Sequence, residues 1–189
     1  MQQNCILKRM KFQMAIHCMM QCLYKDLRLA AHPTLYIFVF LGALVIVPSY
    51  PYSLVFFFGC LSPFITMMYG RETNDIYYMA LLPIEKRKIV TSKCFLFVVT
   101  QLSQLLFSTP FAILHAIYLS QSNMVGLKPN IAYYGFGFLI YAIFNFIFLT
   151  EFFKTAYKTG KAFIFAIIPA VICMIAMEIF PHLPGTDWL

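Results

Sequence analysis

The chain has 189 residues, of which 61 % are hydrophobic and only 11 % are charged, whereas a soluble domain carries roughly 25 % charged residues. This composition excludes an ordinary soluble protein. The net charge of +7 is better explained by anchoring at the ends of membrane spans than by nucleic-acid binding, because basic residues gather on the cytosolic side of membrane proteins.

Apolar runs of about 20 residues recur along the chain, and this is the length that crosses about 30 Å of hydrocarbon at 1.5 Å per residue. The sequence therefore predicts an all-α polytopic bundle with five transmembrane spans. The expected spans lie near residues 29–47, 52–69, 94–119, 131–150 and 162–180. In this division, residues 1–31 form an N-terminal cytosolic amphipathic helix and residues 32–189 form a single transmembrane domain.

The N-terminal helix is predicted from apolar residues at helical spacing. Leu23 and Leu27 lie on one side, while Lys25 and Arg28 lie on the opposite side. A helix with a basic face of this kind lies along the inner membrane surface. A continuation of the first span below the bilayer explains the same pattern equally well.

The distribution of basic residues predicts the orientation. With the N-terminus in the cytosol, thirteen of the fourteen Lys and Arg residues fall in cytosolic segments, and only Lys128 falls outside. A bias of this size sets topology. Five spans then put the C-terminus outside. The Pro-Gly turn in the last nine residues resembles the start of a hairpin, so we expect a sixth span to be missing, although a five-span protein remains possible.

The loop 70–93 is the longest charged interruption, with three of the seven acidic residues and five of the fourteen Lys and Arg. Asp75 suits the start of a short helix, because acidic residues favour a helix N-terminus. That helix should end near Leu82, since the residue before Pro83 is pushed away from helical geometry, and Pro83 suits the first turn of the next helix. The loop predicts a docking surface for a cytosolic partner, with an ordinary solvated loop as the alternative.

The loop contains, in order, the residues Glu72, Asn74-Asp75, Leu82-Pro83, Lys86-Arg87, Ile89-Val90 and Lys93. This pattern resembles that of a known family, the small permease subunits of type 2 ABC transporters. Lys25-Asp26-Leu27-Arg28, just before the first span, is similar to the N-terminal amphipathic helix of that family. The sequence departs from the family at Leu81 and Glu85, where a small polar residue is common, and in having five spans where the family has six.

The resemblance implies a permease subunit of an ATP-binding-cassette exporter in the cytoplasmic membrane of a bacterium. Two such subunits, identical or paired with a paralogue, would form the translocation path among the membrane lipids. Separate cytosolic ABC ATPase subunits would dock beneath them, with segment 72–85 as the coupling helix. The residues assigned to ATPase coupling are Glu72, Asn74, Asp75, Tyr77, Leu82, Pro83 and Arg87.

No catalytic, cofactor-binding or metal-binding residue is assigned. The sequence has no phosphate-binding loop of the GxxxxGK[ST] type, so ATP hydrolysis would reside in a partner. The six cysteines have neither CxxC pairing nor a histidine at ligand spacing, so they are expected to be apolar fillers.

Two ionisable residues are expected within the spans. Glu178 lies near the outer end of the fifth span, where it should reach water, although an intramembrane acid is a functional candidate by default. His115 in the third span is expected to be a packed, hydrogen-bonded side chain. Close packing is also the expected role of Gly135-Phe136-Gly137 in the fourth span.

Two other functions compete with the permease. One is a non-transporting immunity or assembly protein that uses the loop only to bind a partner. The other is an intramembrane enzyme, which needs paired carboxylates, a Ser-His pair or histidine ligands on facing spans. Glu178 and His115 stand on different spans without such partners, so the enzyme is the weakest of the three.

Overall fold

A computed structural model of the chain describes residues 20–21, 23–30, 33–47, 50–81, 85–119, 131–155 and 158–179. Every regular element within these ranges is a helix, and no strand occurs among them. The expected all-α fold is confirmed.

Four helices in the described part of the chain are long and apolar enough to cross a membrane. They are α3 (Ser53–Glu72), α5 (Lys86–Leu114), α6 (Ile131–Lys154) and α7 (Thr159–Ile179). The shorter elements are the π-helix η1 (Asp26–Ala30), α2 (Thr34–Phe40), the 3-10 helix η2 (Leu41–Ile46), α4 (Asp75–Leu81) and the π-helix η3 (His115–Leu119). The multi-pass membrane character expected from composition is therefore present in the fold.

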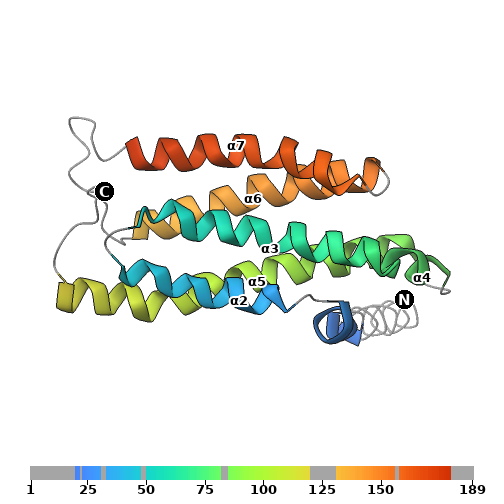
Figure 1. Ribbon diagram of the computed structural model, residues 1–189, viewed down its shortest axis with the longest axis horizontal. Helices are drawn as coiled ribbons and strands as arrows, with labels where there is room; N and C mark the ends of the chain where they lie inside the picture. The colour runs from blue at the N-terminus through green and yellow to red at the C-terminus, as the bar shows by residue number, and fades with distance from the viewer. Residues whose placement is uncertain are drawn as a thin grey trace, which may run out of the picture.

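The long helices run side by side along the long axis of the molecule, and neighbours in the chain run in opposite directions (Figure 1). α7 packs on α6 and α3, while α2 packs on α3 and α5. The end of α3, the short helix α4 and the start of α5 lie together at one end of this bundle, close to η1 (Figure 1). We call this end the charged end.

The first apolar segment is shorter than the expected span 29–47. η1 and α2 are separate elements, and Pro33 immediately precedes α2. The seven residues of α2 and six of η2 extend about 22 Å at the rises of α- and 3-10 helices. As one straight helix this segment falls short of the roughly 30 Å of hydrocarbon.

The helices after the first segment reach beyond the expected spans at the charged end. α3 continues to Glu72, and α5 already begins at Lys86, eight residues before the expected start of the third span at Cys94. The charged residues that mark the loop in the sequence are therefore largely helical. The loop 120–130 and the tail from residue 180, which bears on a sixth span, lie outside the described residues.

A glycine sets the contact between α3 and α6. A Cβ at Gly137 would come within 2.4 Å of the ring of Phe56, whereas a Cβ at Gly135 would meet nothing within 4 Å. Phe56 is fully buried against Tyr133 and Tyr141. Of the two glycines expected to serve close packing, Gly137 does so and Gly135 does not.

Candidate functional site

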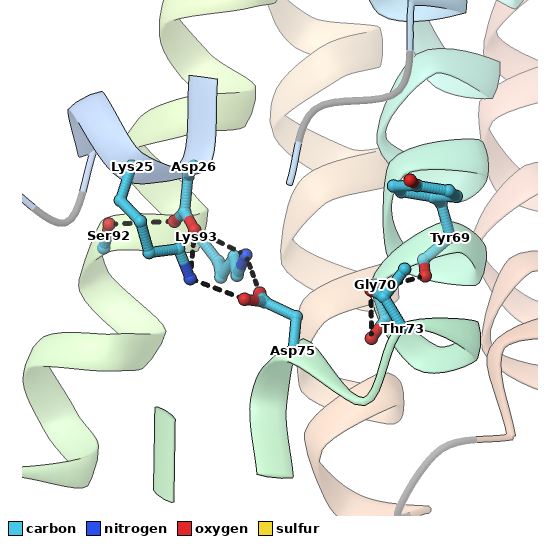
Figure 2. A network of polar contacts seen from close by, with 8 residues as sticks. All are labelled: Lys25, Asp26, Tyr69, Gly70, Thr73, Asp75, Ser92 and Lys93. Carbon is cyan, nitrogen blue, oxygen red and sulfur yellow. Dashed lines mark hydrogen bonds and ion pairs between the residues drawn. The ribbon is translucent and has the colours of Figure 1, made fainter. Parts of the chain in front are cut away.

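The charged end is shaped by a sharp turn between α3 and α4. Thr73 follows the last residue of α3, and its hydroxyl donates a hydrogen bond to the Tyr69 carbonyl at 3.0 Å. Asn74 has a φ of 54°, in the left-handed region that Asn tolerates better than most residues. α4 begins at the next residue, Asp75. The turn directs the Asp75 carboxylate toward η1 and α5 (Figure 2).

Two lysines and two aspartates meet at this point (Figure 2). Asp26 belongs to η1, Asp75 to α4 and Lys93 to α5, and Lys25 immediately precedes η1. Lys93 Nζ lies 2.9 Å from Asp26 Oδ1 and 2.8 Å from Asp75 Oδ2. Lys25 Nζ lies 2.5 Å from Asp75 Oδ1 and 3.2 Å from Asp26 Oδ1. Ser92 adds a hydrogen bond from its hydroxyl to Asp26 Oδ2 at 3.2 Å. We call Lys25, Asp26, Asp75 and Lys93 the ion cluster.

The ion cluster is buried and electrically balanced. The Asp26 side chain is fully buried, that of Lys93 is 3 % exposed, and those of Asp75 and Lys25 are 13 % and 27 % exposed. Removing charges from water costs several kcal/mol per ion, and only close opposite charges with good hydrogen bonds offset that cost. Each charge in the cluster therefore depends on its partners, which ties η1, α4 and α5 together.

The cluster shifts the pKa values of its two outer members. Burial by itself raises the pKa of the Asp75 carboxyl, but the positive charge of Lys93 and the hydrogen bonds from Lys25 and Lys93 outweigh it and lower the pKa. Burial by itself lowers the pKa of Lys25, yet the hydrogen bond to Asp75 and the charge of Asp26 raise it overall. Both residues are thus charged throughout the neutral range.

α4 has one face against the bundle and one face in the open. Met79 is buried, whereas Tyr77, Tyr78 and Leu81 are 58 %, 64 % and 66 % exposed. These three residues stand at i, i+1 and i+4, so they share one side of the helix. An aromatic and aliphatic face of this kind is suited to contact with another protein.

The residues predicted for coupling do not form one cluster. Asp75 belongs to the ion cluster and Tyr77 to the open face of α4. Glu72 and Asn74 are exposed at the turn between α3 and α4, and Arg87 is exposed at the start of α5. Leu82 and Pro83, where one helix is expected to end and the next to begin, lie outside the described residues.

Sequence reasoning missed the buried partners of Asp75. Lys93 was named only for its match to the family pattern, and Asp26 had no assigned role beyond the resemblance of its segment. A signal for Asp26 was present, because it falls next to Leu27 and three residues after Leu23, on the apolar side of the helix. A carboxylate on an apolar face needs a buried cation.

The two ionisable residues expected in the spans lie at the opposite end of the bundle and do not meet. His115 is buried, with Nε2 at 3.3 Å from the Tyr52 hydroxyl. The Ser53 hydroxyl donates a hydrogen bond to Glu178, which is partly buried. Each therefore has a hydroxyl partner on or next to α3.

Polar side chains of α5 also form hydrogen bonds within the bundle, and sequence analysis assigned them no role. Gln101 and Asn145 pair through their amides, at 3.2 Å and 2.6 Å. The Tyr141 hydroxyl donates to Gln104 Oε1 at 2.9 Å, and Gln104 Nε2 donates to the Val55 carbonyl at 3.0 Å. These bonds join α5 to α6 and α3 inside an otherwise apolar bundle.

Among the residues that the structure describes, no group of three or more His, Cys, Asp and Glu side chains is arranged to hold a metal ion. Residues 21–185 match a sequence family described as ABC-2 family transporter protein. No curated protein and no solved structure matches the chain significantly.

Proposed function

The chain belongs to the ABC-2 family of transporter proteins and is a membrane permease of an ABC transporter that works with an ABC ATPase, and on this premise we propose that α4 is its coupling helix. In this proposal the open face of α4 receives the ATPase subunit. The ion cluster then passes the movement of α4 to η1 and to the base of α5. The observation that carries the proposal is the pairing of Asp75, at the start of α4, with Lys25 and Lys93.

The geometry supports transmission through α5 in particular. α5 is a continuous helix of 29 residues, and Lys93 stands in its second turn. A force on α4 acts on Asp75, then on Lys93, and then on a rigid helix that crosses the bundle. Because Asp26 accepts from the same Lys93 ammonium, η1 would move with this unit.

We infer the rest of the transporter from the family. ATP hydrolysis resides in the separate cytosolic ATPase, the charged end faces the cytosol, and the N-terminus lies on that side. A second permease subunit, a copy or a paralogue, completes the translocation path of an exporter in a bacterial cytoplasmic membrane. Lys86 and Arg87 begin α5, and Lys154 ends α6. Lys158 immediately precedes α7. These helix ends lie at the charged end (Figure 1), and basic residues there support this orientation.

The coupling proposal is tested with the open face of α4. Tyr77→Ala combined with Leu81→Ala should leave the permease in the membrane but abolish its binding to the ATPase, because interface energy concentrates in a few aromatic and aliphatic contacts. The measurements are copurification of the ATPase and its rate of ATP hydrolysis with the permease present. The control is Tyr118→Ala, which removes a still more exposed tyrosine (77 %) from the opposite end.

A double variant that still binds and stimulates the ATPase as the wild type does would overturn the coupling role of α4. A different pair of results would favour the alternative, an immunity or assembly protein that uses the same surface only for binding. In that case the double variant no longer binds the ATPase, but the wild-type chain together with the ATPase transports no substrate. Transport assays on the wild-type pair separate these two functions.

A further inference from the structure

A groove lies between α5 and α6 on the outside of the bundle, at the charged end. Its volume is about 390 Å³, and its lining includes Val90, Cys94 and Val98 from α5. From α6 it includes Asn145, Leu149 and Phe153. Neither the ion cluster nor the open face of α4 contributes to it. From Val90 to Val98 the groove extends about 12 Å along α5, which is most of one leaflet of a roughly 30 Å hydrocarbon core.

The groove lining offers few polar groups that a bound molecule would have to hydrogen-bond. Six of the eight lining residues are apolar side chains or cysteine. The two polar ones are hydrogen-bonded within the protein, Asn145 to Gln101 and the Thr150 hydroxyl to the Phe146 carbonyl. A hydrocarbon chain fits such a surface better than a polar substrate, which would leave its own polar groups unpaired.

The mouth of the groove is basic. Lys86 stands one turn before Val90 on α5, and Lys154 stands one turn after Thr150 on α6, so the helical repeat places both at the same end of the groove. Both are exposed. Lys154 has Glu151 at 3.6 Å, but an exposed pair of this kind is weak. Because the two helices are antiparallel, the start of α5 and the end of α6 lie at the same end of the bundle (Figure 1). Each of these helix ends carries one of the two lysines.

We propose that this groove binds one anionic phospholipid, with an acyl chain between α5 and α6 and the phosphate at Lys86 and Lys154. Charge complementarity selects the headgroup, and the apolar lining selects the tail. Basic pockets between transmembrane helices bind anionic headgroups in this way. The lipid would cover Asn145 and keep its pairing with Gln101 dry, since water at that depth would compete for both amides.

The test measures lipid bound to the purified, detergent-solubilised protein by native mass spectrometry. The probes are phosphatidylglycerol and phosphatidylcholine at equal concentration. The wild type should retain phosphatidylglycerol in preference to phosphatidylcholine. The variant Lys86→Gln with Lys154→Gln should lose this preference, by about fivefold for each cation removed. The charge-matched control, Lys158→Gln with Lys161→Gln, should keep it.

A second pair of variants tests where the acyl chain of the lipid binds. Val98→Trp fills the groove and should reduce the retained lipid, and Cys94→Phe fills it from a neighbouring position. Leu106→Trp places the same indole on the same helix at an exposed site outside the groove and should retain the lipid. Circular dichroism checks that each variant is folded.

Three results would overturn the proposal. Equal losses in the two double lysine variants would mean that only diffuse charge attracts the lipid. Unchanged lipid retention in both Val98→Trp and Cys94→Phe would exclude the groove as the tail site. Dissociation of a dimer by the groove-filling variants, without a change in bound lipid, would assign the groove to a second copy of the chain.

Discussion

Asp26 and Lys93 are 67 positions apart in the chain, yet their side chains meet in the protein interior with Oδ1 and Nζ 2.9 Å apart. Neither side chain is more than 3 % exposed. Asp75 binds the same ammonium group from the other side. One buried lysine therefore holds the π-helix η1 and the short helix α4 on the base of α5, the longest helix in the described part of the chain.

Loss of the Lys93 charge should destabilise the fold strongly. Lys93→Met removes the more deeply buried of the two cations that Asp26 and Asp75 share, and breaking a buried ion pair from one side costs about 3–5 kcal/mol. The matched control is Lys88→Met on the same helix. Lys88 pairs with the exposed Glu85 at 3.9 Å, and such surface pairs contribute about 0–1 kcal/mol.

The free energy of unfolding in detergent, followed by circular dichroism, distinguishes the two variants. Similar losses for Lys93→Met and Lys88→Met would mean that the ion cluster contributes no more than a surface pair. The double variant Asp26→Lys with Lys93→Asp exchanges the two charges. Its free energy of unfolding should stay below that of the wild type, because the exchange places a lysine beside Lys25.

The contribution of Asp75 to the free energy of unfolding should be constant over a broad range of pH. Its pKa is lowered below the ordinary 3.8, so its stabilisation is fully present above that value and is lost as the pH falls through the lower folded pKa. The pKa of Lys25 is raised above 10.5, so its stabilisation is present below 10.5 and is lost as the pH rises through the folded pKa.

The measurement is the difference in unfolding free energy between the wild type and Asp75→Asn as a function of pH. This difference should be flat from about pH 5 to pH 9 and should shrink in stronger acid. A decrease between pH 8 and pH 5 would contradict the assigned pairing, since the pKa of Asp75 lies below this range and that of Lys25 lies above it.

Alanine at the two glycines of α6 should have opposite effects. Gly137→Ala pushes a methyl group against the buried ring of Phe56, and overpacking of this kind costs about 1–3 kcal/mol. Gly135→Ala meets open space and should stabilise α6 by about 0.5–1 kcal/mol through helix propensity. Thermal unfolding of both variants in one detergent compares them, and an equal effect of the two would refute the packing described for Gly137.

The amide pair between α5 and α6 should show measurable coupling. In a double-mutant cycle of Gln101→Leu and Asn145→Leu, the double variant should be more stable than the sum of the single losses predicts. Intramembrane side-chain pairs couple by about 0.6 kcal/mol on average, with a maximum of about 1.7 kcal/mol. Ser103→Ala combined with Asn145→Leu is the control, because the Ser103 hydroxyl bonds to the Val99 carbonyl of its own helix and should not couple.

The sequence alone determined the fold class and the position of the charged loop. Apolar runs long enough to cross a bilayer are separated by charged segments, and water and lipid sort such segments without any tertiary contact. The short helix that begins at Asp75 was also predictable, because acidic and small polar residues favour a helix N-terminus locally. The division of the first apolar segment into separate elements was not predictable, since hydropathy does not reveal that η1 and α2 are separate helices and that α2 begins only after Pro33.

Only the tertiary structure decided which residues act together. Lys86 and Lys93 are both lysines near the start of α5, yet Lys86 is exposed and Lys93 is buried between two aspartates. Gly135 and Gly137 are two positions apart, yet only Gly137 faces Phe56. Composition and periodicity describe a residue and its near neighbours in the chain. The partners of Lys93 and Gly137 come from distant segments, whose positions are set by how the helices pack.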